Sequence, residues 1–218
     1  MRRRKTYTIP KKPNLKYEKQ LWGDGFRIVA GLDEAGRGAW AGPVYAAAVV
    51  LPTDTRVIKL LDGVQDSKRM TPLQRNRWKG CIQSAAISWT IGSATHQEID
   101  KLGIVPATCL AMRRAIDKMV YEPTYLLVDY IQISGCACPQ ISLPKGDCRS
   151  LSIAAASVLA KTARDAYMVK LDRRFPGYGF ARHKGYGTRQ HTAALAELGP
   201  CPVHRYSFRP IKNAVEAL

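Results

Sequence analysis

The chain of 218 residues carries 34 Lys and Arg against 17 Asp and Glu, a formal net charge of +17, and 46% of its residues are hydrophobic. This charge favours a polyanionic partner, because each phosphate that Lys or Arg neutralises releases a counterion, although a ribosome or an acidic membrane surface would also satisfy it. The longest apolar runs, 44–51 and 153–160, are too short to span a bilayer, and the six cysteines include no C-x-x-C pair, so we expect a soluble, cytoplasmic protein with reduced thiols.

The N-terminal segment, residues 1–26, is predicted to be a basic extension that is partly disordered. Residues 1–13 hold six basic residues, two prolines and no acid, a composition that does not bury enough apolar surface to fold by itself. No apolar segment follows Met1–Lys5, so a secretory signal is excluded. The extension either binds phosphates loosely or only solubilises the chain. Residues 27–218 are predicted to form one domain, because no linker rich in Pro, Gly or Ser divides them.

Hydrophobic periodicity after residue 26 predicts strands and helices. The strands are expected at 27–32, 44–51, 87–94, 125–128 and 140–143, and the helices at 105–120, 150–173 and 189–198. The first half of the helix at 150–173 is apolar on nearly all sides, so we expect it to be buried. Strands first, and then alternating strands and helices, indicate an α/β or α+β sheet covered by helices.

The most informative local feature is the segment Gly31-Leu-Asp-Glu-Ala-Gly-Arg-Gly38, at the end of the first predicted strand. Because side chains alternate along a strand, Asp33 shares its face with small or apolar groups. A buried carboxylate is costly there unless it is paired or binds a cation. Glu34 points to the other face and shares a cation with Asp33 only if the strand ends there, which the following glycines allow. Taken alone, the segment is equally typical of a solvated acidic turn.

Two further acids favour a cation site. Asp129 ends a short apolar strand, where ligands gather in sheets with parallel strands, and Asp147 lies in Lys145-Gly-Asp147 just before the buried helix. Each also has a local interpretation, Asp129 as a turn former and Asp147 as a helix cap. Hydrolysis of a phosphodiester by two divalent ions requires such carboxylates inside a basic shell, because hard cations prefer carboxylate oxygens.

From about Lys16 to the C-terminus, a series of motifs in order resembles the ribonuclease HII family, the type 2 ribonucleases H. They are Ala30-Gly-Leu-Asp-Glu-Ala-Gly-Arg-Gly38, Ala41-Gly-Pro-Val44, Asp66-Ser-Lys68, Ala111-Met-Arg-Arg-Ala115, Leu127-Val-Asp129, Lys145-Gly-Asp147, Ser152–Lys161, Arg164-Asp165 and His183–Thr188. Each is weak alone, but the ordered set is specific. Two positions depart from the family pattern: Tyr130 stands where Gly is usual, and Ala39-Trp40 stands where Pro-Leu is common.

The resemblance implies an α/β, ribonuclease H-like fold: a mixed five-stranded sheet flanked by helices, with a helical C-terminal segment. It implies a monomeric endonuclease that cleaves the RNA strand of RNA–DNA hybrids and cuts 5′ of single ribonucleotides in duplex DNA, leaving a 3′-hydroxyl and a 5′-phosphate. The biological role would be ribonucleotide and primer removal. The implied cofactor is Mn²⁺ or Mg²⁺, two ions held by the catalytic quartet Asp33, Glu34, Asp129 and Asp147.

Asp165 is a rival for the fourth place in this quartet. It lies four residues after Lys161 on a predicted helix, so an ion pair between the two is the simpler interpretation.

The resemblance also implies how RNA is told from DNA, which only the 2′-hydroxyl distinguishes. The backbone of Gly36, Arg37 and Gly38 would meet that hydroxyl. Tyr186, between two glycines, would contact the same group and pack on the next deoxyribose, with Tyr178 as a competing choice. Phosphates, which set affinity and register without reading sequence, would be held by Lys68, Arg182, His183 and Lys184.

Two other functions remain open. A preference for long RNA–DNA hybrids, as in the related type 3 enzymes, is one, although those enzymes usually carry an N-terminal domain for which residues 1–26 leave no room. The other is a basic nucleic-acid-binding module without catalysis. It explains the charge but not the acids at strand ends beside glycines, and it predicts metal-independent binding without turnover.

Overall fold

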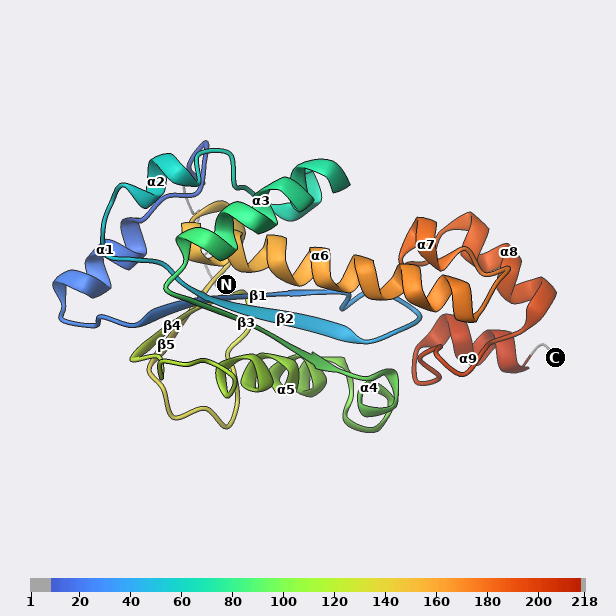
Figure 1. Cartoon of the computed structure of the whole chain (residues 1–218). Helices are drawn as coiled ribbons and strands as arrows, with labels where there is room; N and C mark the ends of the chain where they lie inside the picture. Colours follow the sequence, from blue (N-terminus) through green and yellow to red (C-terminus); the bar gives the residue numbers. More distant parts are fainter. Residues whose placement is uncertain (1–8, 217–218) are drawn as a thin grey trace, which may run out of the picture.

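The computed structural model describes residues 9–216 and centres on a mixed five-stranded sheet (Figure 1). Its strands are β1 Val29–Ala35, β2 Val44–Val50, β3 Ser88–Ala94, β4 Tyr125–Asp129 and β5 Gln140–Leu143. They lie in the order β3-β2-β1-β4-β5; β1, β2 and β3 pair antiparallel, whereas β4 and β5 run parallel to β1. The predicted ribonuclease H-like sheet is confirmed, with β1 extending three residues beyond its predicted end at residue 32.

Helices occupy most of the connections. They are α1 Lys16–Gly23, α2 Val57–Leu60, η1 Ser67–Arg69, α3 Pro72–Ala85, α4 His96–Leu102, α5 Ile104–Ile116, η2 Gly146–Cys148, α6 Leu151–Arg174, α7 Phe180–His183, α8 Arg189–Leu198 and α9 Arg209–Glu216. The predicted helices correspond to α5, α6 and α8. Within residues 9–216, no helix is both long and apolar enough to cross a membrane.

Helix α3 was not predicted, although its start is encoded locally. Thr71 Oγ1 accepts a hydrogen bond from the Gln74 amide at 3.3 Å, and Gln74 Oε1 accepts one from the Thr71 amide at 2.8 Å. This reciprocal pair, with Pro72 at the first helical position, satisfies donors that a helix start leaves free. Few of the residues that follow are buried, so the apolar periodicity that found the other long helices is absent.

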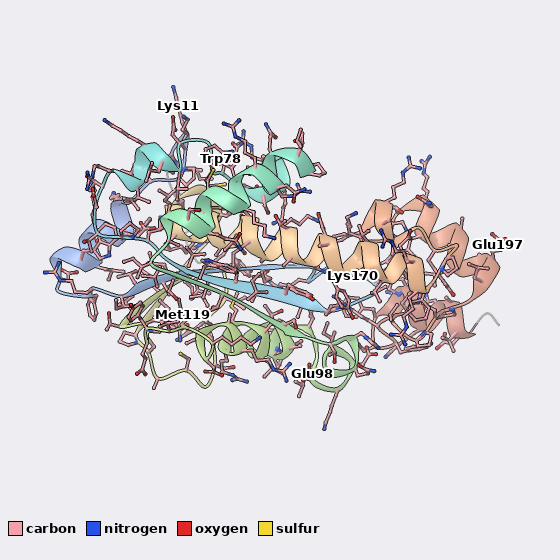
Figure 2. All side chains as sticks on the ribbon, in the orientation of Figure 1. Lys11, Trp78, Glu98, Met119, Lys170 and Glu197 are labelled. Carbon is pink, nitrogen blue, oxygen red and sulfur yellow. The ribbon has the colours of Figure 1, made fainter. Side chains whose placement is uncertain are left out.

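Two apolar layers enclose the sheet. Helices α3 and α6 cover one face and α5 covers the other (Figure 1), and the labelled Trp78 and Met119 mark these two sides in Figure 2. Every residue of 151–160 is buried, as predicted. A Cβ at Gly31 of β1 would overlap the Ser152 backbone of α6, so strand and helix meet almost backbone to backbone. This contact brings the end of β1 beside the start of α6.

Helix α1 lies within the segment assigned to the N-terminal extension, yet its Leu21 and Trp22 join the core. Its Glu18 is 1% exposed and accepts hydrogen bonds from Ser150 Oγ at 2.6 Å and from Ser152 Oγ at 2.7 Å, at the start of α6. Burial raises the pKa of the Glu18 carboxyl, and these hydrogen bonds oppose that rise. Of the predicted disordered arm, residues 1–8 lie outside the described residues.

The C-terminal helices α7, α8 and α9 pack against the far half of α6, beyond the end of the sheet (Figure 1). They enclose a third core that includes Met168 of α6 and Phe180 of α7. This segment is the predicted helical C-terminus, and it meets the loop that follows β1.

Candidate active site

The site begins where two parallel strands part. Leu32 of β1 and Val128 of β4 are their last registered pair, and the next residues are Asp33 and Asp129. Strand β1 does not end there, because it stays paired with β2 as far as Ala35, so the expected strand end at Asp33 and Glu34 is wrong. Asp129 nevertheless raises the pKa of both carboxyls, so both lie within its field. Asp33 and Asp129 therefore face a gap between strands, and the Glu34 amide donates to Asp33 Oδ1 at 2.7 Å.

Asp147 reaches the same place from the turn before α6. The Gly146 amide donates to Asp129 Oδ1 at 2.6 Å, which ties this turn to the end of β4. A Cβ at Gly146 would lie 2.7 Å from Ile153 Cδ1 and 3.3 Å from Asp129 Oδ1. Glycine is therefore required for the close approach of the two acid-bearing segments.

The four predicted acids destabilise one another's charge. Burial raises the pKa of Asp33 well above its usual range, and Glu34, Asp129 and Asp147 raise it further. Burial likewise raises the pKa values of Glu34 and Asp129. For Asp147, burial and then Asp129 raise the pKa to about 6. The structure thus brings all four carboxyls into one field, although their sequence separation reaches 114 residues.

The chemistry of this donor set suits a divalent cation, although no three of the four carboxyls bring ligand atoms within 4.8 Å of one another among residues 9–216. Glu34 Oε2 is buried without a hydrogen-bond partner within residues 9–216, and the Asp33 side chain is 5% exposed. Buried carboxylates that repel one another and lack donors are costly, and hard cations bind such oxygens. The residues present therefore suit Mn²⁺ or Mg²⁺ better than they suit a structural core.

Two cations border the acids. Arg37 NH1 lies 3.3 Å from Glu34 Oε1. Desolvation opposes the charge of Lys68, but Asp33, Asp66 and Asp147 raise its pKa above the usual value. Lys68 therefore faces the acid cluster, which is the place where a scissile phosphate would approach.

Sequence reasoning missed Asp66 as a member of this cluster. The carboxyls of Asp66 and Asp147 and the Cys148 thiol lie within 4.8 Å of one another, the group of three metal-type ligands found among the described residues. Burial raises the pKa of Cys148 to about 11, so its thiol stays protonated and is a poor ligand. Asp66 was visible in Asp66-Ser-Lys68, but a turn acid whose Oδ1 accepts the Lys68 amide at 2.9 Å has no distinctive pattern.

The loop 36–43 is held by two buried arginines, Arg164 of α6 and Arg205, which we call the arginine clamp. Both are 0% exposed. Arg164 donates to the carbonyl oxygens of Pro43 at 2.9 Å, Ala41 at 3.1 Å and Lys184 at 2.9 Å. Arg205 donates to those of Gly42 at 2.9 Å, Arg37 at 2.8 Å and Gly36 at 2.8 Å. Sequence reasoning did not find the clamp.

The clamp fixes the orientation of the Gly36-Arg37-Gly38 backbone. Gly36 has φ +97°, and a Cβ there would overlap the Arg164 side chain. Because the carbonyls of Gly36 and Arg37 point toward the clamp, the loop amides are free to face elsewhere. In the part of the chain described, the Arg37 and Gly38 N–H groups have no acceptor.

Tyr186 lies beside this loop. Its ring centroid is 5.6 Å from Lys161 Nζ and 5.4 Å from Arg164 Cζ, and its carbonyl contacts His191 Nδ1 at 3.1 Å. The rival Tyr178 is buried, and its hydroxyl donates to the Gly199 carbonyl at 2.7 Å, so it belongs to the C-terminal core. The two tyrosines are thereby separated, and Tyr186 alone of the pair borders the loop 36–43.

Trp40, one of the two departures from the family pattern, ties the two loops together. Its amide donates to the Gly185 carbonyl at 2.7 Å, and its ring fills the space that a Cβ at Gly187 would need. The Trp40 ring also packs on His191, with centroids 5.4 Å apart. The substitution therefore adds packing behind Tyr186.

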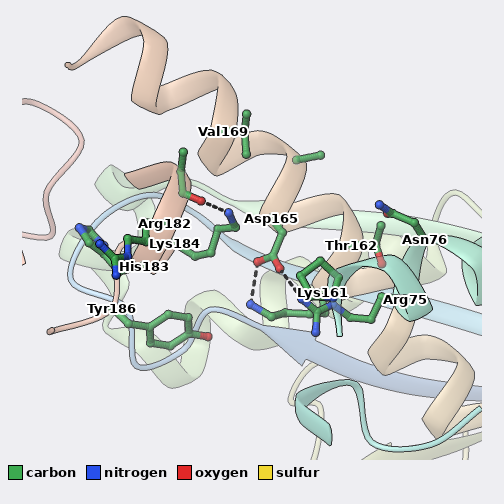
Figure 3. A pocket seen from close by; sticks show the side chains of 13 residues that line it. Arg75, Asn76, Lys161, Thr162, Asp165, Val169, Arg182, His183, Lys184 and Tyr186 are labelled. Carbon is green, nitrogen blue, oxygen red and sulfur yellow. Dashed lines mark hydrogen bonds and ion pairs between the residues drawn. The ribbon is translucent and has the colours of Figure 1, made fainter. Parts of the chain in front are cut away.

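The predicted phosphate-binding residues divide into two groups. His183 is buried, with Nε2 2.7 Å from the Tyr178 carbonyl and Nδ1 accepting the Gly185 amide at 3.1 Å, so both ring nitrogens are engaged. Arg182 is exposed and Lys184 partly so. Asp165 lies 2.6 Å from Lys161 Nζ and 3.1 Å from Arg75 NH2, a paired acid apart from the cluster (Figure 3).

Tyr130, the other departure, adopts a left-handed conformation with φ +59° directly after Asp129. Only Gly enters this region without steric cost, which accounts for the usual Gly. The Tyr130 side chain is 66% exposed, so the ring does not fill the acid cluster.

Comparisons with known proteins agree on one family. The model of the family described as ribonuclease HII matches residues 30–211. A ribonuclease HII from Roseiflexus castenholzii is 50% identical over 208 residues, covering 94% of this chain and 92% of that protein. The ribonuclease H2 of Pyrococcus horikoshii superposes with a TM-score of 0.71 at 24% identity, covering 87% and 97%. A Bst RNase HIII in complex with Mn²⁺ gives 0.69 at 19% identity, covering 87% and 70%. The last two likenesses speak to the fold alone.

Proposed function

The chain belongs to the ribonuclease HII family and is a ribonuclease H-type endonuclease, and from that premise we propose that it cuts 5′ of ribonucleotides in duplex DNA and cleaves the RNA strand of RNA–DNA hybrids. The products would be a 3′-hydroxyl and a 5′-phosphate. The single observation that carries the proposal is the cluster of buried, mutually repelling acids beside a basic surface. A binding module has no use for such a cluster, whereas a phosphodiesterase requires it.

In this proposal Asp33, Glu34, Asp129 and Asp147 hold Mn²⁺ or Mg²⁺. Bound divalent ions of this kind activate a water and stabilise the oxyanion that develops on the phosphate. Glu34, Asp129 and Asp147 all raise the pKa of Asp33, so Asp33 would be the residue that both ions share. A Bst RNase HIII, which shares the fold, is described in complex with Mn²⁺.

Recognition of the ribose would come from the loop 36–43 and Tyr186. The free N–H groups of Arg37 and Gly38 are donors for a 2′-hydroxyl, and the arginine clamp holds them in place before substrate arrives. The Tyr186 hydroxyl and ring supply a second contact and a surface for the next sugar. Because the 2′-hydroxyl is the group that separates RNA from DNA, these contacts set the specificity.

Phosphates of the substrate would be held by Lys68, Arg182 and Lys184, with Lys68 nearest the reacting phosphate. His183 supports the loop of Tyr186 through the Gly185 amide and holds no phosphate. The biological role we propose is removal of ribonucleotides from DNA and of RNA primers, performed by a cytoplasmic monomer.

The test uses three labelled duplexes: DNA with one ribonucleotide, DNA alone, and RNA on DNA. Each is incubated with the protein in Mn²⁺, in Mg²⁺ or in chelator. We expect metal-dependent cutting on the 5′ side of the lone ribonucleotide and none in all-DNA duplex. Asp33→Asn should abolish cutting in either metal while leaving duplex binding within about twofold of wild type, since the phosphate contacts remain. Cutting by Asp33→Asn at the wild-type rate would remove the acid cluster from the mechanism.

The same experiment separates the alternatives. A type 3 preference predicts faster cutting of the RNA–DNA hybrid than of the single ribonucleotide at equal concentration. A binding module predicts tight binding in chelator and no cutting under any condition. Either result would replace the function proposed here.

A further inference from the structure

A groove runs from Tyr186 between α3, α6 and α7, with a cavity volume of about 560 Å³ (Figure 3). Arg75 comes from α3, Lys161 and Asp165 from α6, and Arg182 from α7, with Lys184 directly after α7. Apart from Tyr186, Arg182, His183 and Lys184, the function proposed above uses no residue that lines this groove. Of the charged residues in the lining, Arg75, Lys161 and Asp165 are thus left without a role.

The groove is positively charged, and ion pairs hold part of its lining in place. Four cations, Arg75, Lys161, Arg182 and Lys184, face a single carboxylate, that of Asp165. Asp165 Oδ1 lies 2.6 Å from Lys161 Nζ, and Oδ2 lies 3.1 Å from Arg75 NH2. One acid cannot balance these cations, so the groove keeps an excess of three positive charges, and a low-dielectric wall strengthens their field.

Lys161 is the cation that this arrangement positions. Its side chain is 17% exposed, and the ammonium lies between the Asp165 carboxylate and the face of the Tyr186 ring. Burial lowers the pKa of Lys161, and Asp165 opposes that change. An ammonium has three donors and Asp165 takes one, so a fixed donor remains for an anion in the groove.

The groove is also joined to the acid cluster. Arg75 NH1 donates to the carbonyls of Ser67 at 3.0 Å and Met70 at 2.5 Å, at the turn that carries Lys68. The Ser67 amide in turn donates to Ser157 Oγ of α6 at 3.3 Å. Lys68, Asp165 and Lys161 therefore belong to one connected set of contacts. A duplex that places a ribonucleotide against Tyr186 would continue along this basic wall.

We propose that the groove is a second phosphate subsite, in which Lys161 binds a backbone phosphate of the duplex away from the scissile one and Asp165 competes with that phosphate for Lys161 and Arg75. The subsite rests on the proposed function, because it assumes a duplex seated at Tyr186. It differs from the 2′-hydroxyl contact in that a phosphate is present in DNA and RNA alike.

The test measures binding of all-DNA duplex and of duplex with one ribonucleotide, by fluorescence anisotropy in chelator at several salt concentrations. Lys161→Met should weaken binding to both duplexes by the same factor and lower the slope of log K against log salt by about 0.9. Between 50 and 200 mM salt, wild type should then lose about 3.5-fold more affinity than the variant, the fold-change that this slope implies. Lys170→Met, an exposed position on the same helix outside the groove (Figure 2), should change neither affinity by a comparable factor.

Asp165→Asn provides the decisive contrast. It removes the only acid of the groove and releases Arg75 and Lys161, so duplex should bind more tightly, opposite in sign to Lys161→Met. If both variants weaken binding together, the ion pair is only structural and the subsite is wrong. A Lys161→Met loss confined to the ribonucleotide duplex would show that Lys161 acts through Tyr186 instead, and would also overturn the proposal.

Free phosphate is the other source of the same chemistry. Inorganic phosphate that raises the melting temperature of wild type but not of Lys161→Met, with duplex affinity equal in the two, would assign the groove to a free anion and contradict our proposal. Because duplex binding is measured in chelator, the subsite is tested even if wild type cuts nothing. Failure of the proposed function and failure of the subsite are thus separate results.

Discussion

Two neighbouring regions bury charge in opposite ways. In the acid cluster, Asp33 and Glu34 are buried beside other carboxyls, and Glu34 Oε2 has no partner within residues 9–216. In the arginine clamp, Arg164 and Arg205 are fully buried without any carboxylate, yet every guanidinium nitrogen donates to a carbonyl oxygen. The clamp is a finished structure, whereas the acid cluster is complete only with a cation. Glu18 Oε2 is also buried without a partner within residues 9–216, so it is the gathering of several carboxyls that distinguishes the acid cluster.

The largest expected effect comes from removing one arginine of the clamp, whose guanidinium nitrogens all donate hydrogen bonds. Arg205→Met removes three hydrogen bonds and leaves the carbonyls of Arg37 and Gly42 without donors, while the Gly36 carbonyl keeps only the Ala39 amide at 3.3 Å. Each buried carbonyl left unpaired is costly, so we expect the free energy of unfolding to fall by roughly 3–5 kcal/mol. Urea denaturation measures this, with the exposed Arg173→Met as a matched control that should stay within about 0.5 kcal/mol of wild type. A small effect of Arg205→Met would mean that the loop holds itself.

The next largest effect is expected from adding a divalent cation to the acid cluster. Mn²⁺ at about one hundred times its dissociation constant should stabilise the protein by about 2.7 kcal/mol, because it binds only the folded cluster. Asp33→Asn should be more stable than wild type in chelator, since it removes one repelling charge, and should lose most of the Mn²⁺ effect. Thermal melting in Mn²⁺, chelator and a matched ionic strength of KCl measures all three. An equal Mn²⁺ effect in both proteins would place the ion elsewhere.

Acid should separate the two regions. Burial lowers the pKa of His191 and of His204, behind the clamp, to about 4, so their neutral forms stabilise the fold above the unfolded value of about 6.5. That contribution, on the order of 1–3 kcal/mol, is lost as the pH falls from about 6.5 to about 4. Asp147, with a pKa raised to about 6, behaves oppositely: its charge destabilises the fold at neutral pH and is relieved as the pH falls through 6.

These opposed contributions can be measured separately in chelator. The unfolding free energy of Asp147→Asn should fall more steeply with decreasing pH than that of wild type, because one of the carboxyl contributions that oppose the histidines is removed. Ring-proton chemical shifts of His191 and His204 report their titration directly. A pKa near 6.5 for either His191 or His204 would contradict the expectation that both rings stay neutral down to about pH 4.

The smallest expected effect concerns Tyr130, the residue directly after Asp129, whose backbone has the left-handed conformation. Tyr130→Gly should stabilise the protein by about 1 kcal/mol, because Gly takes the left-handed conformation without a steric penalty. Tyr130→Ala keeps a Cβ and should show no such gain, which separates backbone strain from loss of the ring. Chemical denaturation of the three proteins resolves the difference. A gain in Tyr130→Ala as large as in Tyr130→Gly would assign the cost to the exposed ring.

Features that depend on neighbouring residues could be predicted from the sequence, whereas features that depend on distant residues could not. The strand period placed Asp33 on the apolar face, and strand ends placed Asp129 correctly, because both follow from local alternation. The clamp was out of reach: Arg205 bonds the Gly36 carbonyl across 169 residues, and a backbone acceptor leaves no mark in a sequence. The burial of His183 was out of reach for a related reason, since it depends on Tyr178 and Gly185 packing around it.

Helix α3 shows the opposite kind of error. Its Thr71–Gln74 capping pair and Pro72 are local signals, and they were present in the sequence. Apolar periodicity does not reveal α3, because only Arg75 and Ile82 of this helix are buried. Local information thus suffices for the acids and for helix starts, whereas the surroundings of a charge depend on segments that meet only in the fold.

Helix α6 has a consequence for how this chain can change over time. Along this one helix, Ser152 donates a hydrogen bond to Glu18, Ser157 accepts one from the Ser67 amide, and Arg164 donates to a carbonyl of the loop after β1. Successive residues turn by about 100° around a helix axis, so one residue inserted after Ser157 would swing Lys161 and Arg164 away from their partners while the first half stayed in place. The length of α6 is thus constrained by these contacts, and insertions should accumulate in surface connections such as 117–124 instead.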